Sequence, residues 1–282
     1  MGDGRTSARR VDVGEVELSV TTGGDGPLVV LLHGFPECSY TWRHVLPRLV
    51  DAGFSVAAPD LRGYRASDRP QELGAYAIDK LVGDVAGLAK ALGSERIHLV
   101  GHDWGGTLAF AVAERHPELV DKLCVIDGAH PELYRTGMWH GAQLLRSWYV
   151  FFFQLPALPE LLVRSRFYLE RVMRGAAPAA FPDDAMQLYV DAMQGPGAAT
   201  AGIDYYRAAS KIGLSAPGII QATTHVLWGD HDEALSQELL TGLDRYAPGV
   251  TVKHFPGASH WLQEEHPDDV SDELLRFFRA PS

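Results

Sequence analysis

Residues Gly101–Gly106 read GHDWGG and stand between two segments of different periodicity. The preceding run, Ile97–Val100, is continuously apolar, as expected of a strand buried on both faces. The following stretch, Thr107–Arg115, has helical spacing and ends before a proline. Small residues on both sides of Asp103 permit a sharp strand-to-helix turn that would lift its carboxyl group above the sheet. An isolated Gly-x-Asp-x-Gly would favour a simple helix cap, but this placement favours a reactive carboxylate.

Outward from this turn, the chain alternates between strand and helix patterns. Strands are predicted at Val11–Thr21, Pro27–Leu32, Phe54–Ala58, Ile97–Val100, Leu123–Ile126, Thr224–Trp228 and Val250–Phe255. Helices are predicted at Thr41–Asp51, Tyr76–Leu92, Thr107–Arg115, Ala234–Tyr246 and Pro267–Phe278. This alternation predicts an α/β fold with a mostly parallel sheet covered by helices on both faces. Residues 131–215 are helix-like throughout and predict a helical cap, which divides the core into residues 1–130 and 216–282.

The composition excludes several classes of protein. The chain has 282 residues, of which 46% are hydrophobic and 22% are charged, so it can bury a large core and is not disordered. Its net charge of −11 argues against a nucleic-acid or anionic-membrane partner. The most apolar segment, Tyr149–Leu158, is far shorter than the roughly 18–20 residues of a membrane span. The two cysteines, Cys38 and Cys124, are expected to be reduced, buried thiols in a cytoplasmic protein, and no zinc-binding spacing occurs.

A carboxylate at the turn implies a particular kind of chemistry. Asp103 is ionised at neutral pH, so it can attack an sp³ carbon without a base and form an ester. Hydrolysis of that ester needs a base and an oxyanion site. The base is expected to be His260, which follows the last predicted strand. Asp232 is the expected orienting acid because it fits the WGxxD pattern in Trp228–Asp232, and Asp127 and Asp230 are the alternatives. Nucleophile, acid and base then follow one another in the order typical of hydrolases with this turn.

The segment His33–Glu37 reads HGFPE and follows the first continuous apolar run. A loop in this position can supply a backbone N–H group to an oxyanion hole. The expected donors are the N–H groups of Phe35 and Trp104. His33 is expected to brace the loop, and the bond between Phe35 and Pro36 is a candidate cis peptide.

These motifs together resemble those of an epoxide hydrolase of the α/β-hydrolase superfamily, in its Asp-nucleophile branch. The matching segments are HGFPE (His33–Glu37), DLRGYRASDRP (Asp60–Pro70), GHDWGG (Gly101–Gly106), WGDHD (Trp228–Asp232) and GASHW (Gly257–Trp261). The resemblance implies an α/β-hydrolase fold with a helical cap inserted after the sixth strand. It also implies that Asp103 is the nucleophile, His260 the base and Asp232 its orienting acid, with no metal and no organic cofactor.

The predicted cap carries two further segments that resemble this family. SWYVFFFQ (Ser147–Gln154) and DYYR (Asp204–Arg207) match the segments that hold two ring-opening tyrosines, which correspond here to Tyr149 and Tyr206. Phenols can donate a hydrogen bond and then a proton to an opening epoxide oxygen. Tyr205 is the alternative to Tyr206. Seven aromatic residues among the 20 positions from Tyr134 to Phe153 indicate an apolar pocket wall, with Phe35, Trp104, Trp148 and Phe152 expected to line the pocket.

Two other functions remain as alternatives. A haloalkane dehalogenase uses the same aspartate nucleophile, and the indole of Trp104 would suit a halide, but that chemistry does not require two tyrosines. A hydrolase fold can also serve as a non-catalytic binding protein. The expected partners are a small apolar epoxide and water, with no nucleic acid and no membrane, and the expected state is a monomer or a homodimer.

Overall fold

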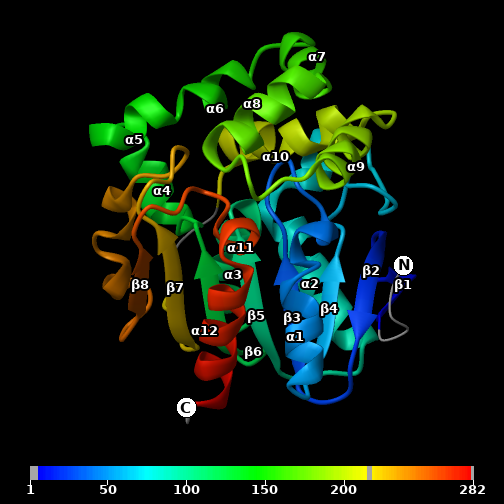
Figure 1. Cartoon of the computed structure of the whole chain (residues 1–282), viewed down its shortest axis with the longest axis vertical. Helices are drawn as coiled ribbons and strands as arrows, with labels where there is room; N and C mark the ends of the chain where they lie inside the picture. Colours follow the sequence, from blue (N-terminus) through cyan, green and yellow to red (C-terminus); the bar gives the residue numbers. More distant parts are fainter. Residues whose placement is uncertain (1–5, 215–217, 281–282) are drawn as a thin grey trace.

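The computed structural model describes residues 6–214 and 218–280, and the strands in these ranges form one eight-stranded sheet (Figure 1). The strands are β1 (Thr6–Asp12), β2 (Glu17–Gly23), β3 (Leu28–Leu32), β4 (Ser55–Pro59), β5 (Ile97–His102), β6 (Val120–Ile126), β7 (Thr223–Gly229) and β8 (Thr251–Phe255). Their spatial order is β1-β2-β4-β3-β5-β6-β7-β8. The pairs β1–β2 and β2–β4 are antiparallel, and all other pairs are parallel. This confirms the predicted mostly parallel α/β fold.

Helices cover both faces of the sheet because the central strands are apolar on both sides. The helices of the core are α1 (Val45–Asp51), α2 (Ile78–Ala91), α3 (Trp104–Arg115), α11 (Leu262–Glu265) and α12 (Pro267–Arg279). Along β3, Val29 and Leu31 belong to a buried cluster with residues of α1 and α12. The alternate residues, Val30 and Leu32, belong to the cluster formed with α2 and α3. Successive side chains of a strand point to opposite faces, so one strand supplies both cores.

A helical layer lies over one end of the sheet (Figure 1). It consists of α4 (Pro131–Gly137), α5 (Gly141–Arg146), α6 (Trp148–Phe152), α7 (Leu158–Val163), α8 (Arg166–Ala176), α9 (Asp183–Gln194) and α10 (Ala198–Ile212). These helices follow β6, which is the sixth strand, and precede β7. The covered end is the carboxyl end of the parallel strands, because Asp103 directly after β5 and Tyr206 of α10 line the same cavity. Functional sites of parallel α/β sheets lie at this end.

Three of the predicted elements are divided in the structure. Val11–Thr21 is not one strand, because the chain turns between β1 and β2, where Val13 N–H bonds to the Val16 carbonyl at 3.0 Å and Gly14 has a φ of +117°. Ala234–Tyr246 is not one helix but contains two short 3₁₀ helices, η3 (Gln237–Leu240) and η4 (Leu243–Arg245).

The second difference has a local cause. The N–H groups of Ala234 and Leu235 bond to the Asp232 carboxylate, and that of Ser236 bonds to Gln143 of α5. Gly242 then adopts a φ of +84°, which interrupts helical geometry. The predicted helix Thr41–Asp51 is likewise divided, into η1 (Ser39–Trp42) and α1.

Two further features bear on the composition. Cys38 and Cys124 are buried free thiols, and burial raises the pKa of each. Within residues 6–214 and 218–280, no helix combines the length and apolar character needed to cross a bilayer.

Two glycines of α2 provide a test of how this helix packs on the β1–β2 turn. A Cβ atom at Gly87 would lie 2.2 Å from the carbonyl oxygen of Val13, whereas one at exposed Gly83 would meet nothing within 4 Å. We expect Gly83→Ala to raise the free energy of unfolding by about 0.5–1 kcal/mol through helix propensity. Gly87→Ala should lower it by about 1–3 kcal/mol, because backbone must move to admit the methyl group. Denaturant unfolding measures both, and equal gains for the two variants would contradict the close approach.

Candidate active site

Asp103 occupies a strained turn between β5 and α3. Its backbone has a φ of +52° and a ψ of −117°, a conformation that is rare for a residue other than glycine. The flanking glycines leave no room for side chains. A Cβ atom at Gly101 would lie 2.1 Å from the Gly105 carbonyl oxygen, and one at Gly105 would lie 2.3 Å from that of Leu32. The small residues are therefore required by the packing of β3, β5 and α3 around the turn.

The loop after β3 touches the carboxyl group of Asp103. The Phe35 N–H group donates to Asp103 Oδ1 at 2.8 Å, and the Phe35–Pro36 bond is cis. A Cβ atom at Gly34 would lie 2.5 Å from that of Asp103, so this loop approaches the turn as closely as its backbone allows. His33 is buried, with Nδ1 2.9 Å from the Gly34 carbonyl oxygen and Nε2 accepting from the Leu61 N–H at 2.9 Å. It braces the loop and does not bond to Asp103.

His260 lies between two carboxylates. Its Nε2 is 3.5 Å from Asp103 Oδ2, and its Nδ1 is 2.7 Å from Asp232 Oδ2. The other oxygen of Asp232 accepts N–H bonds from Ala234 and Leu235 at 2.7 and 2.8 Å, which fixes the orientation of the carboxylate. The structure therefore brings together the three residues that the sequence predicted as nucleophile, acid and base.

The two alternative acids have other partners. Asp127, after β6, is fully buried, and its Oδ1 accepts from the Gly229 N–H at 2.7 Å. Its Oδ2 has no hydrogen-bond partner in the described part of the chain. Burial, together with the charge of Asp232, raises the pKa of Asp127 well above its usual range. Asp230 instead contacts His254 Nδ1 at 2.7 Å and accepts from Gln237.

A buried network that the sequence did not suggest holds the loop of His260. His102 Nε2 lies 2.8 Å from the backbone oxygen of His260, and its Nδ1 lies 2.8 Å from Glu37 Oε2. Burial alone would lower the pKa of His102, but the Glu37 carboxylate raises it above the ordinary value. The other oxygen of Glu37 accepts from Thr41 and Gln263. His102 belongs to the motif GHDWGG and Glu37 to the motif HGFPE. Their place in these two motifs is the only feature of the sequence that could have indicated a structural role for them.

Charges within the site oppose the effect of burial. Burial would raise the pKa of Asp103, but the hydrogen bond and positive charge of His260 bring it below its usual value. Burial would lower the pKa of His260, but Asp232 and Asp103 together raise it well above its usual value. The resting site is therefore a carboxylate beside an imidazolium, and the carboxylate is available for attack.

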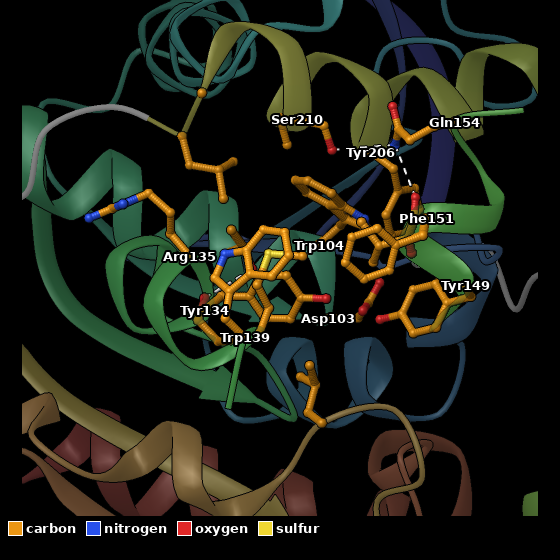
Figure 2. Close-up of a pocket in the computed structure, with 18 residues that line it drawn as sticks. Asp103, Trp104, Tyr134, Arg135, Trp139, Tyr149, Phe151, Gln154, Tyr206 and Ser210 are labelled. Atoms are coloured by element: carbon orange, nitrogen blue, oxygen red, sulfur yellow. Dashed lines mark hydrogen bonds between the residues drawn. The ribbon is translucent and has the colours of Figure 1, made fainter. Parts of the chain in front are cut away.

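Two tyrosines from the helical layer face the turn. Tyr149 of α6 and Tyr206 of α10 have ring centroids 5.8 Å apart with an interplanar angle of 85°. Tyr206 also packs edge-on against Trp104, at 5.0 Å. In Figure 2 the hydroxyl of Tyr149 points toward Asp103. Burial raises the pKa of both phenols well above the usual range, and the charge of Asp103 adds to this effect. Both groups are therefore protonated hydrogen-bond donors.

Tyr205 has a different position. Its hydroxyl group donates to the backbone oxygen of Arg62 at 2.8 Å, and its ring packs against Tyr64 and Tyr76. It lines neither of the cavities beside Asp103.

Two cavities, of about 430 and 510 Å³, meet at the turn. Asp103, Tyr149 and Tyr206 line both of them, and their volumes suit small organic molecules. Apolar side chains predominate in each wall. The first cavity, shown in Figure 2, is lined among others by Trp104, Tyr134, Met138, Trp139 and Phe151, and the second by Phe35, Phe153, Leu162, Tyr168 and Trp261.

The predicted pocket residues are partly correct. Trp104 lines the first cavity, and Phe35 and Trp148 line the second. Phe152 lines neither and instead packs beside Trp148 and Phe153, because successive residues of a helix point about 100° apart. Tyr134, which opens the aromatic-rich segment expected to form the pocket wall, lines the first cavity, and its hydroxyl lies 3.3 Å from Ser147 Oγ.

Comparison with known proteins places this site in a family. A family model described as alpha/beta hydrolase fold matches residues 27–267. A Bacillus subtilis protein named as a member of the AB hydrolase superfamily is 37% identical over 276 residues, which cover 95% of this chain and 96% of that protein. Epoxide hydrolase 3 of Xenopus tropicalis is 35% identical, over 90% of this chain and 71% of that protein.

The fold agrees with solved structures of the same group. An epoxide hydrolase from Bacillus megaterium, solved in complex with an inhibitor, superposes with a TM-score of 0.88 at 29% identity, over 96% of this chain and 100% of that one. An epoxide hydrolase from hot-environment metagenomes superposes with a TM-score of 0.86 at 31% identity, over 98% and 99% of the two chains. Motifs, fold and relatives agree, and the chain is an α/β-hydrolase of the epoxide hydrolase group.

Proposed function

We propose that the protein converts an apolar epoxide to a vicinal diol through an alkyl ester on Asp103. The observation that carries this proposal is that Asp103, Tyr149 and Tyr206 line both cavities. A bound epoxide would have a carboxylate on one side and two phenol donors on the other. Relatives named epoxide hydrolase support the same reaction class.

In the first step, an oxygen of Asp103 attacks one epoxide carbon, a C–O ester bond forms, and the C–O bond of the ring breaks. The electron pair of the broken bond goes to the ring oxygen. An alkoxide is a poor leaving group, so the hydroxyls of Tyr149 and Tyr206 must donate hydrogen bonds to it, and one of them a proton. The high pKa values of both phenols keep those protons in place until the oxygen gains charge.

The imidazolium of His260, whose pKa falls once Asp103 is an ester, returns its proton to the phenolate. In the second step, water attacks the carbonyl carbon of Asp103 while the neutral His260, oriented by Asp232, takes a proton from that water. The N–H groups of Phe35 and Trp104 would stabilise the oxyanion. The former already bonds to Asp103 at 2.8 Å, and the latter belongs to the first residue of α3, where backbone donors lack helical partners. Collapse of the intermediate gives the hydroxyl proton to the leaving oxygen and releases the diol, which restores the Asp103 carboxylate and leaves His260 protonated as in the resting site.

The catalytic groups of this mechanism come from two different parts of the chain. We assign residues 1–130 and 216–282 to a core that supplies nucleophile, acid and base. Residues 131–215 form a cap that supplies the two phenols and most of the aromatic wall. The boundary between residues 215 and 216 lies outside the described residues.

A haloalkane dehalogenase is the second candidate, because Trp104 lines the first cavity beside the same nucleophile. A halide leaves without protonation, so two buried phenols would contribute little to that reaction. A non-catalytic role is disfavoured by the 2.7 Å contact between His260 and Asp232 and by their proximity to Asp103.

The covalent step is tested with His260→Gln. We expect wild type to convert styrene oxide to the diol and the variant to accumulate the ester, because alkylation needs no base whereas hydrolysis does. Intact-protein mass spectrometry should show an increase equal to the mass of the epoxide, and turnover should fall by about 10³-fold. Halide release from haloalkanes without diol formation from any epoxide would contradict the proposed function.

The acid is tested with two isosteric variants. Asp232→Asn should lower turnover by about 10²–10³-fold, because the amide cannot stabilise the imidazolium of His260. Asp127→Asn should retain turnover within about threefold, because Asp127 bonds to the Gly229 N–H group and not to His260, and an amide oxygen in the same position can accept that bond. Steady-state kinetics on one epoxide checks both, and the reverse order of losses would move the acid to Asp127.

The phenols are tested with a matched pair of adjacent residues. Tyr206→Phe should lower the rate of ester formation by about 10–100-fold, and Tyr149→Phe with Tyr206→Phe should abolish it. Tyr205→Phe should keep the rate but lower the free energy of unfolding by about 1 kcal/mol, because the Arg62 carbonyl loses its donor. Stopped-flow alkylation and denaturant unfolding separate the two effects. A normal rate in the double variant would exclude the phenols as donors.

A further inference from the structure

The exposed apolar side chains of the protein are concentrated on one part of the cap. Of the twelve large apolar residues that are exposed in the described ranges, nine lie between Trp139 and Phe167. The most exposed are Leu145, Phe167 and Leu161, at 79, 77 and 71%. They belong to α5, α8 and α7, and Figure 1 shows α5, α6 and α7 along the rim farthest from the sheet. We call the exposed apolar residues of 139–167 the rim patch, because three quarters of the exposed large apolar side chains in the described ranges fall in this segment.

The sequence segment that carries the rim patch has a net charge opposite in sign to that of the whole chain. Residues 131–176 contain six arginines and three glutamates and therefore carry a net charge of +3, whereas the chain carries −11. Among the described residues, Arg146, Arg164 and Arg171 form no ion pair with a carboxylate, and Arg171 is exposed. The prediction of no membrane partner used only the net charge, which averages over this segregation.

Both cavities reach the rim patch. Trp139 and Phe151 line the first cavity and are 55 and 43% exposed, and Trp148 lines the second and is 58% exposed. An apolar molecule that entered from this face would pass along apolar side chains to Asp103.

We propose that the rim patch docks the protein on the surface of an anionic lipid bilayer. Exposed Trp, Phe and Leu beside arginines are the composition of surfaces that insert to the depth of the headgroups. The negative charge of anionic lipids attracts each basic residue that lies near the membrane surface. A second copy of the chain fits the patch less well, because a two-fold contact would bring the exposed arginines of this segment, Arg164 and Arg171, toward the same arginines of the other copy. Delivery of an epoxide from the bilayer to the cavities rests on the proposed function, but the docking itself does not.

The experiment measures vesicle binding by co-sedimentation of the full chain and requires no catalysis. Wild type should bind vesicles that contain about one third phosphatidylglycerol, bind pure phosphatidylcholine weakly, and dissociate when NaCl rises from about 50 to about 500 mM. Leu145→Ser, Leu161→Ser and Phe167→Ser together should weaken binding about tenfold or more. None of these residues lines either cavity, so turnover of a water-soluble epoxide should be unchanged.

Two further variants separate the sources of binding. Arg164→Gln with Arg171→Gln should reduce the preference for phosphatidylglycerol and the salt dependence. Ile219→Ser with Val252→Ser removes exposed apolar residues outside the patch and should leave binding unchanged. Docking is overturned if wild type does not sediment with phosphatidylglycerol vesicles at low salt, or if the triple variant binds like wild type. It is also overturned if sedimentation velocity shows a dimer that the triple variant disrupts while vesicles bind neither protein.

Discussion

The turn at Asp103 is the constraint around which the rest of the site is arranged. A non-glycine residue at a φ of +52° costs about 1–3 kcal/mol and persists only where the surroundings enforce it. Here the enforcement is steric, since Gly101 and Gly105 have carbonyl oxygens within 2.1–2.3 Å of where a Cβ would lie. The same close packing brings the Phe35 N–H group to Asp103. Strain at one residue thus fixes the nucleophile relative to both the oxyanion donor and the base.

The charges around His260 differ between the resting site and a site in which Asp103 is an ester. In the resting site His260 lies between Asp103 and Asp232, and both carboxylates raise its pKa. If Asp103 becomes an ester, it loses its charge, and one of the two groups that keep the imidazole protonated is removed. The pKa of His260 must then fall, so the histidine becomes a base at the step that needs one. Asp127 bonds instead to the Gly229 N–H group, and burial beside Asp232 raises its pKa well above the usual range.

The sequence predicted those parts of the site that local patterns and sheet topology determine. The α/β fold and the meeting of Asp103, Asp232 and His260 follow from motifs placed after parallel strands, whose carboxyl ends share one edge. The sequence did not predict features that depend on contacts between side chains far apart in the chain. The segment Ala234–Tyr246 has helical spacing, yet its first N–H groups bond to Asp232 and Gln143. The link from Glu37 through His102 to the His260 loop spans three separate segments, and no spacing reveals it.

The aromatic richness of the cap has two physical roles that the sequence alone did not separate. The helix α6 reads WYVFF, and a helix that is apolar on all sides is expected to be buried on all sides. Instead, Tyr149 faces the nucleophile and Val150 is buried, while Trp148 and Phe151 remain exposed. Trp148 and Phe151 also line the cavities, but these residues are 58 and 43% exposed, and the pocket does not account for the exposed part. The outward aromatics, together with the basic charge of the same segment, are the two properties on which the proposed docking at a lipid interface rests.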